Sequence, residues 1–551
     1  MPTLRSPAGP NSTALSGTAL SGTALSGTAL SGTALRRTLL ALMLAGATLA
    51  AATLLAAAQD RPRGGPPPAD HPQTEQQRPS EQRQAPAGPG VLRLLPGDAV
   101  TQHSIEIPGG KLDYTATAGT LALFDQSGER SAAIYYTAYV AKGAGPNRPV
   151  TFVFNGGPGA ASAFLNLGLV GPRIAQFGLA NKDGALTKLQ DNPDTWLTFT
   201  DLVLIDPVGS GWSRTAKPDG GSAFWGVRRD AESMAKTIAL YVANNGRASS
   251  PKYIMGESYG AFRAAKVARA LQDQQGIVVS GIVMLSPLLD GALTFGGSRQ
   301  ALGAALQLPS LAAAELERKG TFSPEKLAQA EHFALTDYLS TLAGAPPQGE
   351  AAHAFYAKVA ALTGLPEDVV EKTHGFIRDT YVKNLNAGAH KIVSHYDATF
   401  AVDDPYPDQV AGRGPDPLLD GVVRAYGGAY VAYARDELGF KTEMTYILLA
   451  SDISGKWDWG EGSGRFGADV SDDLRVLLSA TPSFRLMIAH GRSDMVTPYA
   501  VSRYVLDHMP QMGDPMRTQL KLYRGGHMLY LDPGSRHAFS SDVKAFYQEG
   551  P

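Results

Sequence analysis

The sequence predicts an α/β protein with a mostly parallel central sheet, flanking helices and a helical cap insertion. Short continuous apolar runs have the length and composition of strands that are covered on both faces. Helical periodicity separates several of these runs, and strands that alternate with helices form parallel sheets with functional residues at their carboxyl ends. The runs are Val150 to Phe154, Leu202 to Ile205, Tyr253 to Met255, Ile282 to Leu285, Leu486 to Ala489 and Leu520 to Tyr523.

Residues 1–58 are predicted to be a low-complexity leader followed by a signal peptide. Thr-Ala-Leu-Ser-Gly recurs from Thr13 to Leu35, and Arg36-Arg37 then precedes an apolar stretch that ends in Ala56-Ala57-Ala58. A basic start, an apolar middle and a small-residue end are typical of an export signal, here cleaved after Ala58. An uncleaved membrane anchor is the alternative, because the stretch is long enough to span a bilayer. We expect an exported bacterial protein, periplasmic or secreted, without stable membrane association if the signal is cleaved.

Residues 59–90 are predicted to be a disordered linker, because Pro, Gln, Arg and Gly dominate and large apolar residues are nearly missing. The first part of the folded core follows at 91–290. It begins with three β-rich runs that indicate an antiparallel meander. These runs are Ser104 to Ile107, Tyr114 to Phe124 and Ala132 to Val140.

Two helices are predicted in this part of the core. Apolar residues of the segment Phe224 to Asn244 recur on one helical face, and a second helical segment spans Phe262 to Leu271.

Residues 291–441 break the alternation of strands and helices and are predicted to form the cap, with the second part of the core at 442–551. Helix starts occur at Ser323-Pro324 and Leu365-Pro366, and helical periodicity runs from Phe333 to Leu342 and from Val369 to Tyr381. A loop rich in Pro, Asp and Gly follows. Its acids lack the spacing of an EF-hand, so we expect a solvated loop in preference to a calcium site. These acids are Asp403, Asp404, Asp408 and Asp416.

Composition narrows the possible functions. The net charge of -2 and the lack of a basic stripe argue against a nucleic-acid partner. The chain contains no cysteine, which excludes disulfides, thiolate metal sites and a cysteine nucleophile. We expect neither a metal nor a cofactor, and the sequence does not predict an oligomeric state.

The central motif is Gly256-Glu257-Ser258-Tyr259-Gly260, directly after an apolar strand. It matches the G-x-S-x-G nucleophile elbow, in which a serine lies on a sharp turn between a strand and a helix. The glycines allow this turn and let the helix pack closely on the strand. The pattern alone is weak, because an ordinary strand-to-helix turn has the same composition.

An acid and a base follow later strands. Asp494 comes shortly after Leu486 to Ala489, and His527 comes after the strand Leu520 to Tyr523 and a Gly-Gly turn. The order Ser, Asp, His is that of α/β-hydrolases, in which the histidine activates the serine and the acid orients the histidine. We prefer these two residues to the other candidates. The other histidines are His490 and His537, and the other acids are Asp469, Asp473 and Asp507.

Four motifs together resemble the serine carboxypeptidase family, specifically its bacterial members. They are Asn155-Gly-Gly-Pro-Gly159, Asp206-Pro-Val-Gly209 with Gly211-Trp-Ser213, Gly256-Glu-Ser-Tyr259 and Gly526-His-Met528. The resemblance runs from about Pro149 to Tyr547 and is interrupted by the cap. It implies an α/β-hydrolase fold and an enzyme that releases carboxy-terminal residues from peptides through an acyl-enzyme.

The resemblance also implies the roles of the site residues. Ser258 is the nucleophile, with Asp494 and His527 as its partners, and the backbone N–H groups of Gly157 and Tyr259 form the oxyanion hole. Glu257, Asn155 and the backbone of Gly156 bind the terminal carboxylate of the peptide. Two carboxyl groups can share such a site only if one keeps its proton.

This sequence departs from the family where the second acid is expected, because Leu169 lies there in Leu169-Val-Gly171-Pro172. We hypothesise that Arg173 or Arg263 partly replaces this acid by binding the carboxylate as a cation, which would extend activity toward neutral pH. The alternative is that Arg263 packs on Glu257 or faces solvent.

Two other functions remain open. An esterase or acyltransferase uses the same scaffold and triad, and Leu169 leaves this possibility. A non-catalytic binding module is the alternative from a different class. Asn155 and Glu257 favour the peptidase.

Overall fold

The computed structural model describes residues 90 to 549, apart from 144, 146, 179–181, 411, 413, 461 and 463. The predicted leader, signal peptide and linker lie outside the described residues, except Gly90. Everything below concerns the described part of the chain.

Ten strands form the main sheet within this part of the chain, in the order β1-β2-β3-β7-β4-β9-β10-β13-β14, with β8 paired to β3. Their bounds are β1 Ala99–Ile107, β2 Gly110–Phe124, β3 Arg130–Ala141, β4 Val150–Phe154, β7 Asp201–Ile205, β8 Arg214–Thr215, β9 Lys252–Glu257, β10 Gly281–Leu285, β13 Arg485–Gly491 and β14 Thr518–Tyr523. Each of the six predicted apolar runs is one of these strands. The predicted meander is β1 to β3, which continues the same sheet through the antiparallel pair β3 and β7.

The strands from β7 to β14 are parallel, so their carboxyl ends lie along one edge of the sheet. Side chains of a strand alternate between the two faces. In β9, Tyr253 and Met255 therefore pack into one hydrophobic core and Ile254 into the other. Because a hydrophobic core covers each face of the sheet, side chains on both faces of these strands are buried, and the strands are continuous apolar runs in the sequence.

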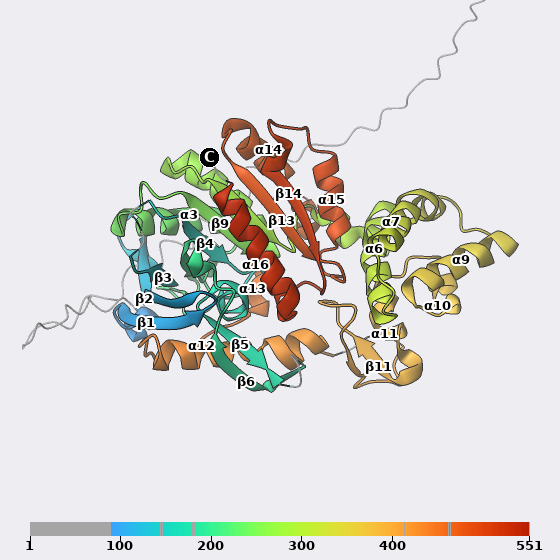
Figure 1. Cartoon of the computed structure of the whole chain (residues 1–551), viewed down its shortest axis with the longest axis horizontal. Helices are drawn as coiled ribbons and strands as arrows, with labels where there is room; N and C mark the ends of the chain where they lie inside the picture. The colour runs from blue at the N-terminus through green and yellow to red at the C-terminus, as the bar shows by residue number, and fades with distance from the viewer. Residues whose placement is uncertain are drawn as a thin grey trace, which may run out of the picture. The chain divides into compact units, whose positions relative to one another are not determined.

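Helices cover both faces of the sheet (Figure 1). The core containing Ile254 also holds residues of α3, α4 and α14, whereas α1, α12 and α16 pack on the opposite face. Their bounds are α1 Ala163–Leu165, α3 Val227–Asn244, α4 Tyr259–Ala270, α12 Ala425–Asp436, α14 Ser471–Ala480 and α16 Pro533–Gln548. The remaining helices of the second core part are α13 Ser451–Lys456 and α15 Tyr499–Asp507.

The region predicted as a cap is mainly helical and has a hydrophobic core of its own. It contains α5 Gly291–Phe295, α6 Ala301–Arg318, α7 Pro324–Phe333, α8 Leu339–Ala343, α9 Gly349–Thr363, α10 Glu367–Lys372, α11 Arg378–Asn384 and the strand pair β11 Lys391–Val393 and β12 Ala401–Asp403. Its last helix, α12, packs on the main sheet, where the Tyr430 hydroxyl bonds those of Tyr135 and Thr137. A separate small sheet, β5 Arg173–Phe177 with β6 Asp183–Asp191, lies near α12 (Figure 1).

One predicted helical stretch, Val369 to Tyr381, is two helices. The chain turns between α10 and α11, where His374 and Gly375 both have positive φ angles of 51° and 87°. The apolar residues on either side of this turn, Val370 and Tyr381, are still buried in the same cap core. The spacing of apolar residues therefore predicted correctly which residues are buried, but it did not reveal the turn between the two helices.

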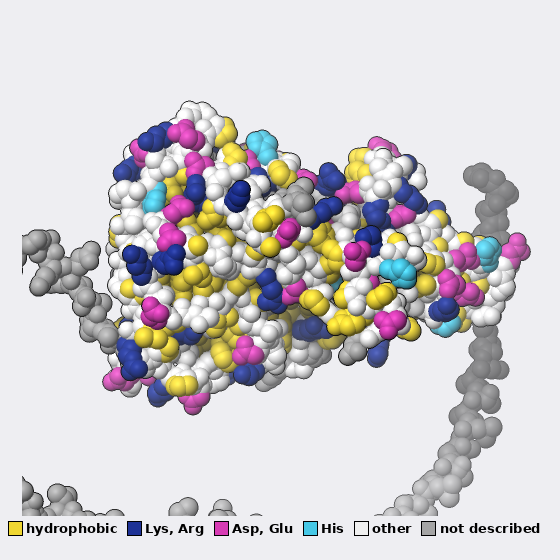
Figure 2. All heavy atoms as spheres, turned by 90° about the horizontal axis from the view of Figure 1, so that it is seen from below, with side chains coloured by type: hydrophobic (Ala, Val, Ile, Leu, Met, Phe, Trp, Pro, Cys, Tyr) yellow, Lys and Arg dark blue, Asp and Glu magenta, His cyan; other side chains and the backbone are white. Residues whose placement is uncertain are grey.

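Figure 2 shows acidic and basic side chains interspersed, with hydrophobic side chains gathered in the middle of the face seen from below. Among the described residues, no helix is both long and apolar enough to cross a membrane.

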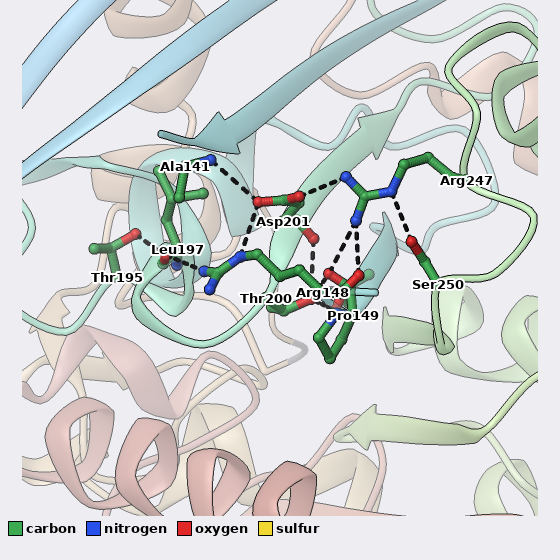
Figure 3. Close-up of polar contacts among 10 residues, drawn as sticks. Ala141, Arg148, Pro149, Thr195, Leu197, Thr200, Asp201, Arg247 and Ser250 are labelled. Atoms are coloured by element: carbon green, nitrogen blue, oxygen red, sulfur yellow. Dashed lines mark hydrogen bonds and ion pairs between the residues drawn. The ribbon is translucent and has the colours of Figure 1, made fainter. Parts of the chain in front are cut away.

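A buried ion cluster joins the starts of the central strands, at the edge opposite their carboxyl ends (Figure 3). Asp201, the first residue of β7, accepts hydrogen bonds from Arg148 Nε at 3.0 Å and Arg247 Nη1 at 2.6 Å. Arg247 Nη2 also donates to the carbonyl of Arg148, 2.8 Å away, beside the start of β4, and Arg247 Nε donates to Ser250 Oγ before β9 at 2.9 Å. One carboxylate thus links the chain segments that begin three neighbouring strands.

Asp201→Asn should lower the free energy of unfolding by about 3–5 kcal/mol, because it leaves two largely buried guanidinium groups without their counter-charge. Urea unfolding followed by tryptophan fluorescence measures this loss. Glu232→Gln is the control, since its partner Arg228 is 80% exposed and such pairs contribute less than about 1 kcal/mol. Equal effects of the two variants would contradict the role of the cluster.

Candidate active site

Ser258 lies on a sharp turn between β9 and α4. Its backbone angles are φ 61° and ψ −125°, a strained conformation for a residue with a side chain. Its N–H donates to the carbonyl of Leu285 on β10 at 2.9 Å, which ties the turn to the neighbouring strand. The side chain is partly exposed, and within the described residues its hydroxyl makes no hydrogen bond. This is the geometry of a nucleophile elbow.

The glycines of the motif serve close packing. A Cβ on Gly256 would lie 2.1 Å from the carbonyl oxygen of Gly260, and one on Gly260 would lie 2.5 Å from that of Phe154 on β4. The unusual backbone angles belong to Ser258 itself. The glycines therefore allow α4 to start directly against the strands.

Two predicted backbone donors lie beside the serine. Tyr259 is the first residue of α4, so its N–H has no partner within the helix. The Asn155-Gly156-Gly157 turn packs against the elbow, since a Cβ on Gly156 would lie 2.8 Å from both Ser258 Cβ and Tyr259 N. Gly157 has a φ of 99°, which suits glycine alone among common residues.

His527 and Asp494 form a buried pair beyond β14 and β13. His527 Nδ1 lies 2.8 Å from Asp494 Oδ2, and both side chains are at most 2% exposed. The other carboxylate oxygen accepts the backbone N–H groups of Val496 at 2.7 Å and Thr497 at 3.1 Å. Burial alone would lower the pKa of His527. The charge and hydrogen bond of Asp494, together with the charge of Glu257, outweigh this effect and raise the pKa of His527 above its ordinary value. The pair is thus arranged to stabilise a protonated imidazole.

The other candidates have different environments. His490 is fully buried and bonds Ser502 Oγ at 2.8 Å, and burial lowers its pKa to about 4. His537 is exposed and pairs with Asp194 at 2.7 Å. Among the acids, Asp473 pairs with Lys266 on α4.

Glu257, the residue before the serine, is 2% exposed. Asn155 Nδ2 donates to its Oε2 at 2.6 Å, and the Tyr530 hydroxyl donates to the same oxygen at 3.1 Å. The Asn155 side-chain oxygen in turn accepts the N–H of Leu165 at 3.0 Å, which sets the orientation of its amide. Burial raises the pKa of Glu257 to about 7, against the lowering effects of His527 and of these two hydrogen bonds.

Tyr530 donates a hydrogen bond to Glu257 in a chain that lacks the second acid expected for the family. Leu169, at the position of that acid, is fully buried in the hydrophobic core together with Tyr530 and Tyr426. A Cβ on the preceding Gly168 would lie 2.6 Å from the Tyr530 ring and 2.7 Å from the Tyr426 hydroxyl. Besides Asn155, the hydrogen-bond partner of Glu257 is therefore the phenol of Tyr530 and not a second acid.

The hypothesis that an arginine replaces the second acid is wrong. Arg263 is buried beneath the elbow, where its Nε donates to Asp230 at 2.6 Å and its Nη1 to the carbonyl of Asn155 at 2.7 Å. Arg173 pairs with Asp191 and Glu437 beside β6. Both guanidinium groups are thus held by other acids, and Arg263 neither packs on Glu257 nor faces solvent.

Sequence reasoning missed three contributors to the site. Thr497 Oγ1 lies 2.8 Å from Asp494 Oδ2 and 2.9 Å from the carbonyl of Ser286, and its place three residues after Asp494 is a usable signal, because short side chains often bond this close in sequence. Tyr530 has no comparable signal. Tyr396, from the cap, places its ring edge-on to His527 with centroids 5.4 Å apart.

Comparison with known proteins agrees with this geometry. A family model described as serine carboxypeptidase matches residues 108–301, which include the Asn155 turn and the elbow. This match supports a serine carboxypeptidase-like hydrolase. The match ends before the loops with Asp494 and His527, so it does not cover these two residues.

Solved structures show the α/β-hydrolase fold. Kex1Δp, a prohormone-processing carboxypeptidase from Saccharomyces cerevisiae, matches with a TM-score of 0.50 at 14% identity, over 79% of this hydrolase and 91% of that chain. Proline iminopeptidase from Mycobacterium smegmatis matches with a TM-score of 0.35 at 16% identity, over 78% and 98% of the two chains. No curated protein sequence matches. The predicted fold class is confirmed.

No group of three or more His, Asp or Glu residues in the described part of the chain is arranged to hold a metal ion. The predicted loop acids bond other side chains instead, for example Asp403 with Lys391 and Asp416 with Ser394.

Asp494→Asn should lower kcat about 10³–10⁴-fold, because an amide facing Nδ1 favours the wrong tautomer of His527. The two backbone N–H groups that bond Asp494 Oδ1 can still bond the amide oxygen, so we expect little change in the fold. Steady-state kinetics with circular dichroism as a fold control measures this. A loss of less than tenfold in a folded variant would contradict the pairing.

Proposed function

We propose that this hydrolase removes residues from the carboxy terminus of peptides, with Ser258 as nucleophile, His527 as general base and acid, and Asp494 as its orienting partner. His527 takes the Ser258 proton as the hydroxyl attacks the scissile carbonyl, and returns it to the leaving amine. The oxyanion of the intermediate is stabilised by the N–H groups of Gly157 and Tyr259. Water then releases the acyl group.

The buried carboxyl group of Glu257 is the observation that carries this proposal. A nucleophile elbow needs no acid at this position, and burying one is unfavourable unless it is neutral or hydrogen-bonded. Asn155 and Tyr530 each donate to Glu257 and hold its carboxyl in place. A protonated Glu257 then offers its own O–H to a carboxylate beside Ser258. The free carboxy terminus of a peptide fits this donor, with the backbone at Gly156 as a second contact.

Three matched substrates test the reaction. A peptide with a free carboxy terminus should release its last residue, and its amidated twin should not, because Glu257 has no carboxylate to bind. Amino-acid analysis of the products follows both, and Ser258→Ala is the blank. Cleavage of a simple ester without release from the free peptide would favour the esterase. Inactivity toward all three would favour a binding module.

The pH dependence of peptide binding follows from Glu257. Below about pH 7 its carboxyl keeps the proton and can donate to the substrate. Above that pH the ionised group repels the substrate carboxylate, so KM rises by about tenfold per pH unit. The two titrations are linked, because the Glu257 charge is one cause of the raised pKa of His527.

Glu257→Gln should abolish the rise in KM between about pH 6 and pH 8, because the amide donates at every pH. The acid limb of kcat should move little, because Glu257 already carries its proton in the complex with the peptide and is uncharged there. Steady-state kinetics across pH with the free peptide measures both effects, and an ester substrate, which has no carboxylate, is the control. A KM that still rises in the variant would assign the titration to another group.

We further propose that the protein is exported, by a signal peptide that ends at Ala58. Support comes from the basic, apolar and small-residue order of residues 36–58. Sequencing the amino terminus of the protein isolated from its native compartment tests this: Gln59 as the first residue supports it, and an intact terminus in the membrane fraction favours the anchor.

A further inference from the structure

The loops that carry the acid and the base contact each other directly. Ser493 N donates to the carbonyl of Gly525 at 3.0 Å, and a Cβ on Gly491 would lie 2.1 Å from the carbonyl oxygen of Gly526. The first loop, residues 492–498, follows β13, and the second, residues 524–528, follows β14. Their separation determines how Asp494 meets His527.

A segment of the cap, residues 394–400 between β11 and β12, binds both loops by backbone hydrogen bonds. His527 N donates to the carbonyl of Tyr396 at 2.6 Å, and Ala398 N donates to the carbonyl of Ser493 at 3.0 Å. The contact is close, because a Cβ on Gly526 would lie 2.0 Å from the Tyr396 oxygen. The cap therefore contacts the backbone of the residues that carry the chemistry.

A single cap carboxylate joins the same two loops by ion pairs. Glu317, in the last turn of α6, has a side chain that is 9% exposed. Its Oε1 accepts from Arg492 Nε at 3.2 Å and Nη2 at 3.1 Å, and its Oε2 lies 3.7 Å from Arg524 Nε. Arg492 is held further by Phe322, with its guanidinium 4.1 Å from the ring centre.

The two arginines are close in sequence to the proposed triad. Arg492 lies two residues before Asp494, and Arg524 lies three residues before His527. The pair of Glu317 with Arg492 is largely buried, so loss of either partner is strongly disfavoured. The side chain of Arg524 is 69% exposed, so its ion pair with Glu317 is the weaker of the two restraints. A displacement of about 1 Å between reacting groups costs about 100-fold in rate, so even a small change in loop separation affects turnover.

We propose that Glu317 is a positioning residue, which sets the separation of Asp494 and His527 through Arg492 and Arg524. This inference rests on the triad of the proposed function. It makes the cap part of the catalytic scaffold. Glu317 itself touches neither the nucleophile nor Glu257, so its loss should affect turnover and leave peptide binding unchanged.

Glu331 offers a matched control. It lies on α7 of the cap and also bonds the second core part, since its Oε1 lies 2.7 Å from both Arg503 Nη1 and the Tyr499 hydroxyl. Both partners are on α15, outside the two loops. If Glu317 only fastens the cap, the two acids should behave alike.

The test compares Glu317→Gln with Glu331→Gln in the full chain. The rate at which a fluorophosphonate labels Ser258 reports activation of the serine without any peptide, and Ser258→Ala is the blank. We expect Glu317→Gln to slow labelling and kcat by about tenfold or more with KM unchanged, and Glu331→Gln to stay within about twofold of the parent. Equal slowing in both variants, or labelling of Glu317→Gln at the parent rate, would overturn the proposal.

Arg492→Lys is the second variant, because it keeps a cation beside Glu317 but loses the second N–H and the contact of the guanidinium with Phe322. Labelling should be intermediate between the parent and Glu317→Gln. If Arg492→Lys has a lower melting temperature but is labelled at the parent rate, the ion pair of Arg492 with Glu317 only stabilises the fold. That result would overturn the proposal. Labelling of the parent without release of amino acids from peptides would instead count against the peptidase function, and the comparison of variants would still stand.

Discussion

A carboxyl group buried beside a nucleophile constrains the whole site. Glu257 is almost fully removed from water, and taking an ionised carboxylate out of water costs several kcal/mol unless it is well paired. No cation within bonding distance of Glu257 is found in the described part of the chain. Asn155 and Tyr530 donate to it, and burial keeps its proton up to about pH 7. Both the proposed recognition of a peptide end and its dependence on pH follow from this one burial.

The choice of Tyr530 as partner has a chemical consequence. Two carboxyl groups that share a site must divide a proton between them, which favours acidic conditions. A phenol of raised pKa stays protonated, so it donates to Glu257 without a titration of its own in the working range. Leu169 is buried in the hydrophobic core and adds no second acid. In the proposed function, a single titrating group therefore binds the substrate carboxylate, and it acts closer to neutral pH.

The cap contacts the loops that carry Asp494 and His527. Its backbone segment 394–400 and Glu317 both contact the loops with the acid and the base, so in our proposal the geometry of the triad depends on residues far from the elbow in sequence. The buried cluster at Asp201 restrains the opposite edge of the sheet, at the starts of β7, β4 and β9. The cap instead contacts the loops that follow β13 and β14.

Much of this arrangement could be predicted from sequence. Ser258, Asp494 and His527 each follow a short apolar strand, and parallel strands bring their ends to one edge, so local pattern sufficed to select them. The contacts around them join distant positions: Tyr530 meets Glu257 across 273 residues, and Arg492 meets Glu317 across 175. The spacing of apolar residues along the sequence carries no information about such long-range pairs. Arg263 shows the converse, because its proximity to the motif suggested a substrate contact while the helix directs it beneath the elbow, toward Asp230.

The most direct test of the account is proton uptake on peptide binding to the inactive Ser258→Ala variant. Calorimetric titrations above pH 7, in buffers of different ionisation enthalpy, count the protons bound with each peptide. We predict that a peptide with a free carboxy terminus takes up close to one proton, that Glu257→Gln in the same background abolishes this uptake, and that the amidated peptide binds far more weakly. Binding of the free peptide without proton uptake, or equal binding of its amide, would contradict the central claim that a protonated Glu257 recognises the carboxylate.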